Sequence, residues 1–153
     1  MKQTLSYEQA LHKAAALCMR SEKCELDIRN KLLAWGINEN DATKIISYLT
    51  TEKFLDNARF CNFFVKDKVR FNKWGKIKIG YALKAKKIDE ALIIEALSEI
   101  DEQETVDNLI TLLRSKQKNL KYKDAFDKKG KLIRFALSRG FEMNTINQAL
   151  KKL

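Results

Sequence analysis

Apolar residues recur along most of the chain at steps of three and four, the spacing that places them on one face of an α-helix. The first apolar stripe consists of Tyr7, Ala10, Leu11, Ala14, Leu17 and Cys18. Five further stripes lie at 42–49, 61–65, 93–100, 106–113 and 146–153. Each stripe needs an apolar partner, so the pattern predicts an all-α protein whose helices pack against one another.

The apolar pattern also repeats along the chain. Segment 28–37 matches segment 79–88 at an offset of 51 residues and segment 132–141 at an offset of 104,. A unit of about 50 residues buries little surface by itself, so we expect the three units to stabilise one another by stacking. The sequence therefore predicts three tandem three-helix repeats in an elongated, curved array. The predicted repeats are 1–52, 53–103 and 104–153.

A tight turn is predicted in each repeat, before its third helix. Gly36 and Gly140 stand at this position in the outer repeats, and glycine readily adopts the left-handed conformation that ends many helices,. Lys87 takes the place of glycine in the middle repeat, where a left-handed residue costs more,. The middle turn is therefore either strained or built differently.

The formal net charge of +10 is unevenly distributed. Residues 1–52 carry seven basic and seven acidic side chains, whereas residues 57–88 carry ten basic side chains against Asp67 alone. Residues 89–104 then carry seven acidic side chains and no lysine or arginine, and a second basic run follows from 114 to 134. A basic block of this kind either keeps a protein soluble or contacts a polyanion such as a nucleic acid.

Two aromatic residues, Phe71 and Trp74, lie within the first basic block. An exposed ring there could stack on a base or pack against another protein while neighbouring cations meet phosphates or carboxylates. The alternative is that both rings belong to the core. The sequence leaves these two interpretations open.

Residues suited to catalysis or metal binding are scarce. The one histidine, His12, lies in an amphipathic segment, and Cys18, Cys24 and Cys61 lie on apolar helix faces without the spacing of a zinc site,. No glycine-rich phosphate loop is present, and the acidic run 89–104 does not resemble a calcium loop,. We therefore expect a protein that is not an enzyme and has no cofactor and no metal.

Unpaired cysteines and the lack of an apolar run of about 18 residues also favour a cytoplasmic protein with no membrane partner.

Segment 54–89 resembles the signature segment of the RecX regulatory proteins of bacteria. The resemblance rests on Leu55-Asp56, Arg59-Phe60, Arg70, Gly75-Lys76, Ile79 and Leu83. RSEKCELDIRNKLLAWGI in the first repeat and RFALSRGFEMNTI in the last are similar to the family's sequences there, so the resemblance covers nearly the whole chain. The chain departs from the family at Lys86-Lys87, where a glycine usually ends the helix.

The resemblance implies a crescent-shaped monomer that binds along the groove of the RecA recombinase filament on single-stranded DNA, with weak direct binding to the DNA itself. Such proteins modulate the recombinase, ATPase and coprotease activities of RecA, and thereby DNA repair and the SOS response, by occupying surface rather than by covalent chemistry. The cations expected to contact the filament or DNA are Arg59, Arg70, Lys73, Lys76, Lys78, Arg134 and Arg139. Arg59 could equally form an ion pair with Asp56.

Two other functions fit the pattern. Residues 21–50 are typical of a helix-turn-helix segment, which would make the protein a sequence-specific DNA-binding protein,. Residues 1–52 carry no net charge, however, whereas a protein that recognises a duplex sequence concentrates cations around its recognition helix,. The third possibility is a repeat scaffold that binds only protein, through the acidic segment 89–104,.

Overall fold

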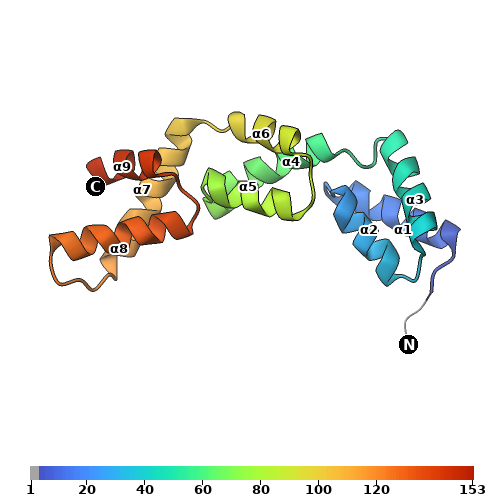
Figure 1. Ribbon diagram of the computed structural model, residues 1–153, viewed down its shortest axis with the longest axis horizontal. Coiled ribbons are helices and arrows are strands. Elements are labelled where there is room, and N and C mark those ends of the chain that lie inside the picture. The colour runs from blue at the N-terminus through green and yellow to red at the C-terminus, as the bar shows by residue number, and fades with distance from the viewer. Residues whose placement is uncertain (1–3) are drawn as a thin grey trace.

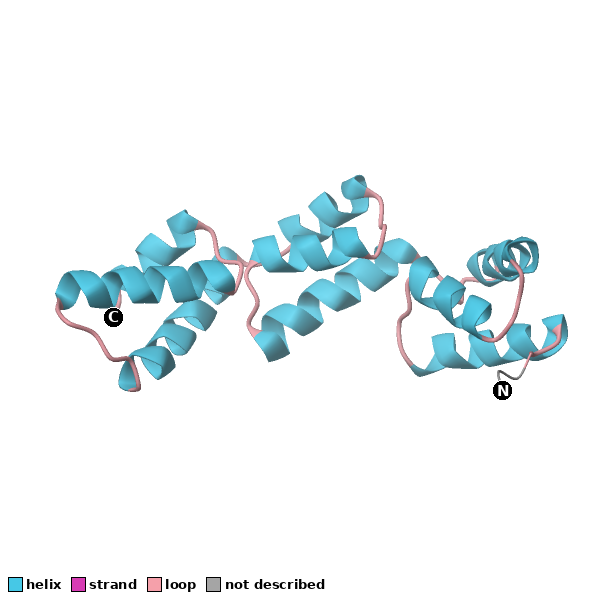
Figure 2. Ribbon diagram, turned by 60° about the horizontal axis from the view of Figure 1, so that its bottom comes forward, coloured by secondary structure: helices cyan, strands magenta, loops and turns pink. Residues whose placement is uncertain are grey.

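The computed structural model describes residues 4–153, and this part of the chain consists of nine α-helices and one short π-helix, with no strand (Figures 1 and 2). Residues 1–3 of the first predicted repeat lie outside the described residues. The helices form three consecutive groups of three in an elongated, curved array (Figure 1). The predicted all-α fold of three tandem three-helix repeats is confirmed.

The helix bounds are as follows. The first repeat holds α1 (Tyr7–Arg20), α2 (Glu25–Ala34) and α3 (Glu39–Thr51). The second holds α4 (Asn57–Asp67), the π-helix η1 (Lys68–Asn72) that continues it, α5 (Lys76–Ala85) and α6 (Glu90–Ser98). The third holds α7 (Glu102–Lys118), α8 (Ala125–Ser138) and α9 (Met143–Lys151).

Polar side chains directly before several helices cap their free backbone N–H groups. The Ser6 hydroxyl accepts a hydrogen bond from the Gln9 backbone N–H at 3.2 Å, and the Gln9 side chain accepts one from the Ser6 N–H at 3.0 Å. The side chains of Asn38, Asp56 and Asp124 each accept one hydrogen bond from a backbone N–H in the first turn of α3, α4 and α8, at 2.8 to 3.0 Å. These caps fix where the helices begin.

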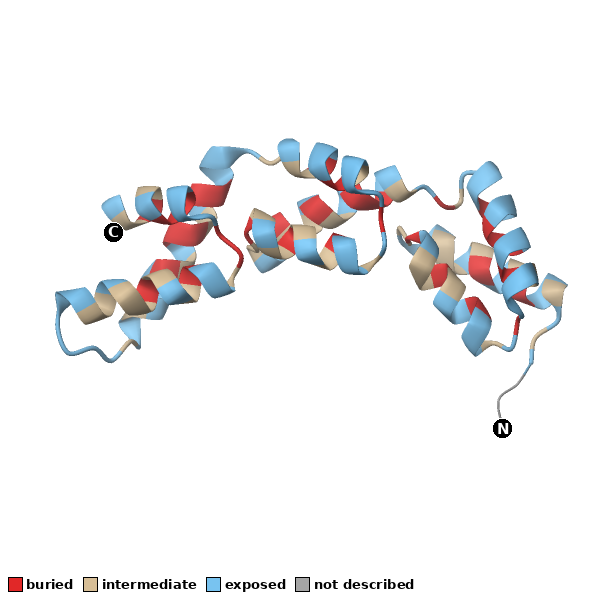
Figure 3. Cartoon of the chain, viewed as in Figure 1, coloured by how far each residue is buried: buried red, intermediate tan, exposed pale blue. Residues whose placement is uncertain are grey.

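Each repeat has its own apolar core, and buried residues face the centre of each group of helices (Figure 3). The positions that match between repeats occupy the same place in each core. They are Ile28 and Leu32 in α2, Ile79 and Leu83 in α5, and Leu132 and Ala136 in α8, all buried. The repeated pattern in the sequence is therefore a repeated set of core contacts.

The turn after the second helix is left-handed in all three repeats. The φ angle is +86° at Gly36, +87° at Gly140 and +58° at Lys87. The middle turn is thus built like the others, with a lysine in a conformation that is strained by roughly 1 kcal/mol or more for a residue with a Cβ atom.

Side chains hold the first repeat to the second. The Arg59 guanidinium Nε donates to both carboxylate oxygens of Glu22, at 2.7 and 2.9 Å. The Lys86 ammonium contacts the two oxygens of Asp27 at 3.0 and 3.3 Å. Burial favours the neutral form of Asp27, but the hydrogen bonds from Lys86 and Cys24 outweigh it and lower the pKa of the carboxyl group,. Cys24 itself, just before α2, is buried in the core of the second repeat.

Backbone atoms hold the second repeat to the third. The N–H of Gly75 donates to the carbonyl of Arg139 at 2.9 Å, and the N–H of Ile77 donates to the carbonyl of Gly140 at 3.0 Å. A Cβ atom on Gly75 would overlap the carbonyl group of Gly140. The third repeat therefore accepts hydrogen bonds from backbone N–H groups at the start of α5. Only glycine at position 75 lets the backbone at Gly140 come this close.

No helix in residues 4–153 is long and apolar enough to cross a membrane.

Candidate nucleic-acid interface

Basic and acidic helices occupy different edges of the array. The second helices of the three repeats, α2, α5 and α8, line its inner, concave edge (Figure 1). Helix α5 carries three lysines and no acidic residue, and α8 carries four basic residues against Asp127. The acidic helix α6 and the start of α7 lie on the opposite, outer edge (Figure 1). The inner edge of the second and third repeats is therefore the more favourable surface for a polyanion.

Two pairs of cations lie over aromatic rings, one in the second repeat and one in the third, on the two sides of the junction between these repeats. Lys68 and Lys78 place their ammonium nitrogens 5.0 and 4.6 Å from the ring centroid of Trp74. Lys116 and Arg139 lie similarly over Phe135, at 5.2 and 5.3 Å. Cation–π contacts orient these long side chains. We call Lys68, Lys78, Lys116 and Arg139 the junction cations.

The main chain joins the two groups. Gly75 follows Trp74 directly and donates its hydrogen bond to the Arg139 carbonyl, so Trp74 and Arg139 are held close together. Within residues 4–153, Lys78, Lys116 and Arg139 form no ion pair, and Lys68 has only its neighbour Asp67, at 3.8 Å. Three of the four cations thus have no internal counter-charge to release before they bind an anion.

Of the seven cations predicted from the sequence, the structure brings Lys78 and Arg139 together among the junction cations. Lys73 lies nearby, just before Trp74, at the end of η1 and with a left-handed φ of +52°. Sequence reasoning missed Lys68 and Lys116. Lys68 lies within the basic block and could have been included on that ground, but nothing in the sequence links Lys116 to Phe135.

Two of the other predicted cations are engaged in holding repeats together. Arg59 pairs with Glu22 and also donates to the carbonyls of Lys53 and Phe54, whereas Asp56 accepts only from the Arg59 backbone N–H. The Lys76 ammonium contacts Glu102 at 3.3 Å. Glu102 also accepts a hydrogen bond from the hydroxyl of buried Thr145 at 3.1 Å, so this pair spans the junction between the second and third repeats.

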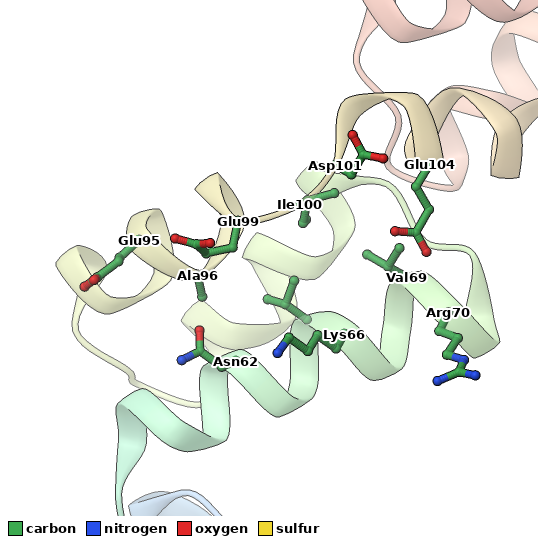
Figure 4. A pocket seen from close by; sticks show the side chains of 11 residues that line it. Asn62, Lys66, Val69, Arg70, Glu95, Ala96, Glu99, Ile100, Asp101 and Glu104 are labelled. Atoms are coloured by element: carbon green, nitrogen blue, oxygen red, sulfur yellow. The ribbon is translucent and has the colours of Figure 1, made fainter.

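Arg70 borders a cavity of about 490 Å³ that lies between α4 and η1 on one side and α6 and the start of α7 on the other. Figure 4 shows Lys66 and Arg70 on the α4–η1 side and Glu99 and Glu104 on the side of α6 and α7. Four acidic residues line this cavity against two basic ones, which disfavours a phosphate group,. Arg134 is exposed on α8 and does not line this cavity.

The two aromatic residues of the basic block differ in environment. Phe71 is 72% exposed, and the Arg70 guanidinium lies 5.6 Å from its ring centroid. Trp74 packs against the core of the second repeat, with its ring edge-on to Phe64 at 6.4 Å. One of the rings is therefore available to a ligand, and the other mainly orients lysines.

The candidate catalytic groups have ordinary surroundings. His12 is exposed on α1. Burial raises the pKa of the Cys24 thiol to about 11 and also raises the pKa values of Cys18 and Cys61, so these thiols stay protonated and unreactive at neutral pH,. Residues 4–153 contain no group of three or more potential metal ligands.

Comparison with known families places two RecX models on this chain. The model of the RecX second three-helix domain matches residues 56–97, and that of the RecX third three-helix domain matches residues 102–150. Among curated relatives, a protein of Clostridium botulinum strain Alaska E43 named Regulatory protein RecX is 36% identical over 87% of this chain and 63% of its own length. One of the same name from Clostridium acetobutylicum is 32% identical over 97% of this chain and 70% of its own. The chain spans under two thirds of the length of several of these relatives, including the first.

Solved structures with the same fold include RecX from Lactobacillus salivarius, with a TM-score of 0.84 at 18% identity and 96% coverage of both chains. A second crystal structure, of a regulatory protein RecX, has a TM-score of 0.87 at 16% identity and covers 95% of this chain and 71% of its own. At these identities the likeness concerns the fold alone.

Proposed function

The chain belongs to the RecX family of regulatory proteins, and on that basis we propose that it binds the filament that RecA recombinase forms on single-stranded DNA and restrains its activities. The observation that carries this proposal is the set of junction cations, which lie over Trp74 and Phe135 on the two sides of the contact between the second and third repeats. The protein acts as a monomer in the cytoplasm, without a cofactor.

The mechanism is occupation of surface. Phosphate groups meet Lys78, Arg139 and their neighbours, while the three repeats extend along the filament. A bound array obstructs recombinase ATP hydrolysis, strand exchange and coprotease function without any covalent step. Because the junction cations contact phosphates and read no bases, binding is independent of sequence and weakens as salt rises.

We assign six of the seven predicted cations to two roles. Lys78, Arg139, Lys73 and Arg134 contact the filament, together with Lys68 and Lys116. Arg59 and Lys76 position the repeats through Glu22 and Glu102. Arg70 contributes less to anion binding, because four carboxylates share its cavity.

A helix-turn-helix reader of duplex DNA is disfavoured by the first turn of α3. This helix would be the recognition helix, and it begins with Glu39 and Asp41. Carboxylates at that end would face the phosphates and base edges of a major groove, where most readers place arginine, lysine, asparagine or glutamine. Binding to a specific duplex sequence with higher affinity than to single strands would favour this alternative.

The test is the DNA-dependent ATPase of the cognate RecA at increasing concentrations of this protein. We expect the wild-type protein to inhibit ATP hydrolysis, and the Lys78→Glu/Arg139→Glu variant to need at least about tenfold more protein for half-inhibition, since two phosphate contacts become repulsive. The control variant, Lys44→Glu/Arg20→Glu, makes the same change in charge on exposed residues of the first repeat. Absence of inhibition by the wild type, or equal loss in both variants, refutes the proposal.

A further inference from the structure

A second basic surface lies around the turn between α7 and α8, at the end of the array remote from the first repeat (Figure 1). A hollow of about 650 Å³ is formed there by the end of α7, the first half of α8 and α9. Lys128, Lys129 and Lys151 line it against one carboxylate, that of the last residue, Leu153. None of these three lysines forms an ion pair within residues 4–153. The hollow therefore keeps a net positive charge, which favours an anionic ligand.

Two exposed aromatic side chains, Tyr122 and Phe126, flank these lysines. The Lys128 ammonium lies 5.3 Å from the ring centroid of Tyr122, which is 48% exposed. Phe126 is 88% exposed and precedes Lys129 by three residues in α8, so the two side chains are neighbours on the helix surface,. A flat ring beside a lysine matches a nucleotide, whose base is flat and whose phosphate is anionic.

Hydrogen bonds hold this turn in one conformation. The Asp127 carboxylate accepts from the backbone N–H of Lys123 at 3.0 Å and lies 3.3 Å from the Lys131 ammonium. Lys131 also donates to the carbonyl of Lys121 at 2.7 Å, and Asp124 caps α8. Both acidic side chains of the turn are thus engaged within it. A ligand meets an ordered surface whose lysines face no competing carboxylate of the turn, which lowers the entropic cost of binding.

The arrangement favours a single strand over a duplex. The bases of a duplex are stacked on one another, so a protruding ring reaches only phosphates and groove edges. In a single strand, a base can expose its face to Phe126 or Tyr122 while the adjacent phosphate meets Lys128 or Lys129. A carboxylate of a peptide would satisfy the lysines but would leave both rings in water.

We propose that the tip of the third repeat, formed by Tyr122, Phe126, Lys128, Lys129 and Lys151, binds single-stranded DNA by stacking on unpaired bases. This site goes beyond the proposed function, because it acts on the bare strand and is separate from the junction cations. Helix α8 has 14 residues, so about 20 Å separates the tip from the junction cation at the other end of the helix,. The junction cations contact phosphates alone, and the tip adds contacts to bases.

Two strands of equal length and charge distinguish stacking from charge attraction. One is an oligothymidylate of about 20 nucleotides, and the other has the same phosphates but abasic sugars. Phe126→Ala removes the exposed ring and raises helix propensity, so a loss of binding cannot be ascribed to unfolding. Phe126→Trp keeps an aromatic face, whereas Phe126→Leu keeps only apolar bulk. Tyr48→Ala on α3, at 47% exposed, is the matched control for Tyr122→Ala.

Affinities are measured by fluorescence anisotropy at fixed salt. We expect Phe126→Ala and Tyr122→Ala each to bind the thymidylate strand roughly tenfold more weakly and the abasic strand within about twofold of wild type. Phe126→Trp and Tyr48→Ala should match wild type, and Phe126→Leu should behave like Phe126→Ala. Lys128→Gln/Lys129→Gln should weaken binding of both strands and make the slope of log affinity against log salt shallower by about 1.4.

Several results overturn the inference. Equal losses on both strands mean that the rings do not stack on bases, and full binding by Phe126→Leu means that no aromatic face is needed. Absence of wild-type binding to the thymidylate strand, or tighter binding to a duplex of the same length, also excludes the site. If Phe126→Ala loses binding to phosphatidylserine vesicles but not to DNA, the tip binds membranes instead. No recombinase is present in these assays, so failure of the tip leaves the proposed function intact, and the ATPase test of that function does not decide the fate of the tip.

Discussion

Substitution of Gly75 by alanine should disrupt the junction between the second and third repeats. The new Cβ atom would overlap the backbone of Gly140, and a backbone cannot move aside as a flexible side chain can,. The repeats must therefore separate locally, which breaks the hydrogen bonds from Gly75 to Arg139 and from Ile77 to Gly140. Each such bond contributes about 1 kcal/mol net, and alanine is also a poor N-cap residue, so we expect a loss of about 2 to 3 kcal/mol in the free energy of unfolding.

Helix α5 contains its own control for this experiment. Gly80→Ala adds the same methyl group five residues later, where the Cβ atom meets only Leu97 at 3.5 Å. This change should stabilise the protein by about 0.5 to 1 kcal/mol, since alanine replaces glycine in the middle of a helix. The two substitutions are chemically identical and are expected to act in opposite directions.

Urea denaturation measures both effects, followed by circular dichroism for the whole array and by tryptophan fluorescence for the surroundings of Trp74 and Trp35. The described backbone contact between Gly75 and Gly140 is refuted if the free energy of unfolding of Gly75→Ala lies within about 0.5 kcal/mol of the wild-type value. It is also refuted if both alanine variants shift the free energy of unfolding in the same direction.

Three further predictions concern other parts of the molecule. Lys87→Gly should raise the free energy of unfolding by about 1 kcal/mol, because glycine relieves the left-handed strain at φ +58°; a lower melting temperature would contradict this,. The pKa of Asp27 is lower in the folded protein than its unfolded value of about 3.9,. Its ion pair with Lys86 therefore stabilises the fold above that pH, and this contribution is lost as the pH falls through the folded pKa,. Asp27→Asn should reduce the free energy of unfolding at pH 7 and much less in acid, and an equal loss at both pH values would exclude the ion pair as the cause. For single-stranded oligonucleotides, the slope of log affinity against log salt should become shallower by about 1.4 in Lys78→Gln/Arg139→Gln, at roughly 0.7 per phosphate contact; an unchanged slope would show that neither cation meets a phosphate.

The sequence was sufficient for features that depend on local periodicity. Steps of three and four predicted the helices, and the offsets between repeats predicted that Ile28, Ile79 and Leu132 hold equivalent positions, where all three are buried. The substitution of Lys87 for glycine identified the site of strain, although the sequence could not decide whether the middle turn would keep the left-handed shape that it has.

Features that depend on distant contacts could not be predicted. Arg59 and Lys76 look like free cations in the sequence, because their partners Glu22 and Glu102 are remote in the chain and are brought near only by the stacking of repeats. The same holds for Lys116 and Arg139, which share the ring of Phe135 from different helices. The charge count located the basic block, but it could not distinguish cations that hold the fold together from those without an internal partner.

The contact between Gly75 and Gly140 also connects stability with anion binding. Lys78 lies in the first turn of α5, just beyond Gly75, and Arg139 directly precedes Gly140, so the two backbone hydrogen bonds that join the repeats also set the spacing of these two cations. Gly75→Ala keeps every charge in the protein. If net charge alone attracts the DNA, this variant will bind a single-stranded oligonucleotide as wild type does, at equal salt and below its melting temperature. If the spacing of the junction cations matters, its affinity will fall several-fold while that of Gly80→Ala stays unchanged, because a displaced cation loses its phosphate contact without any loss of charge.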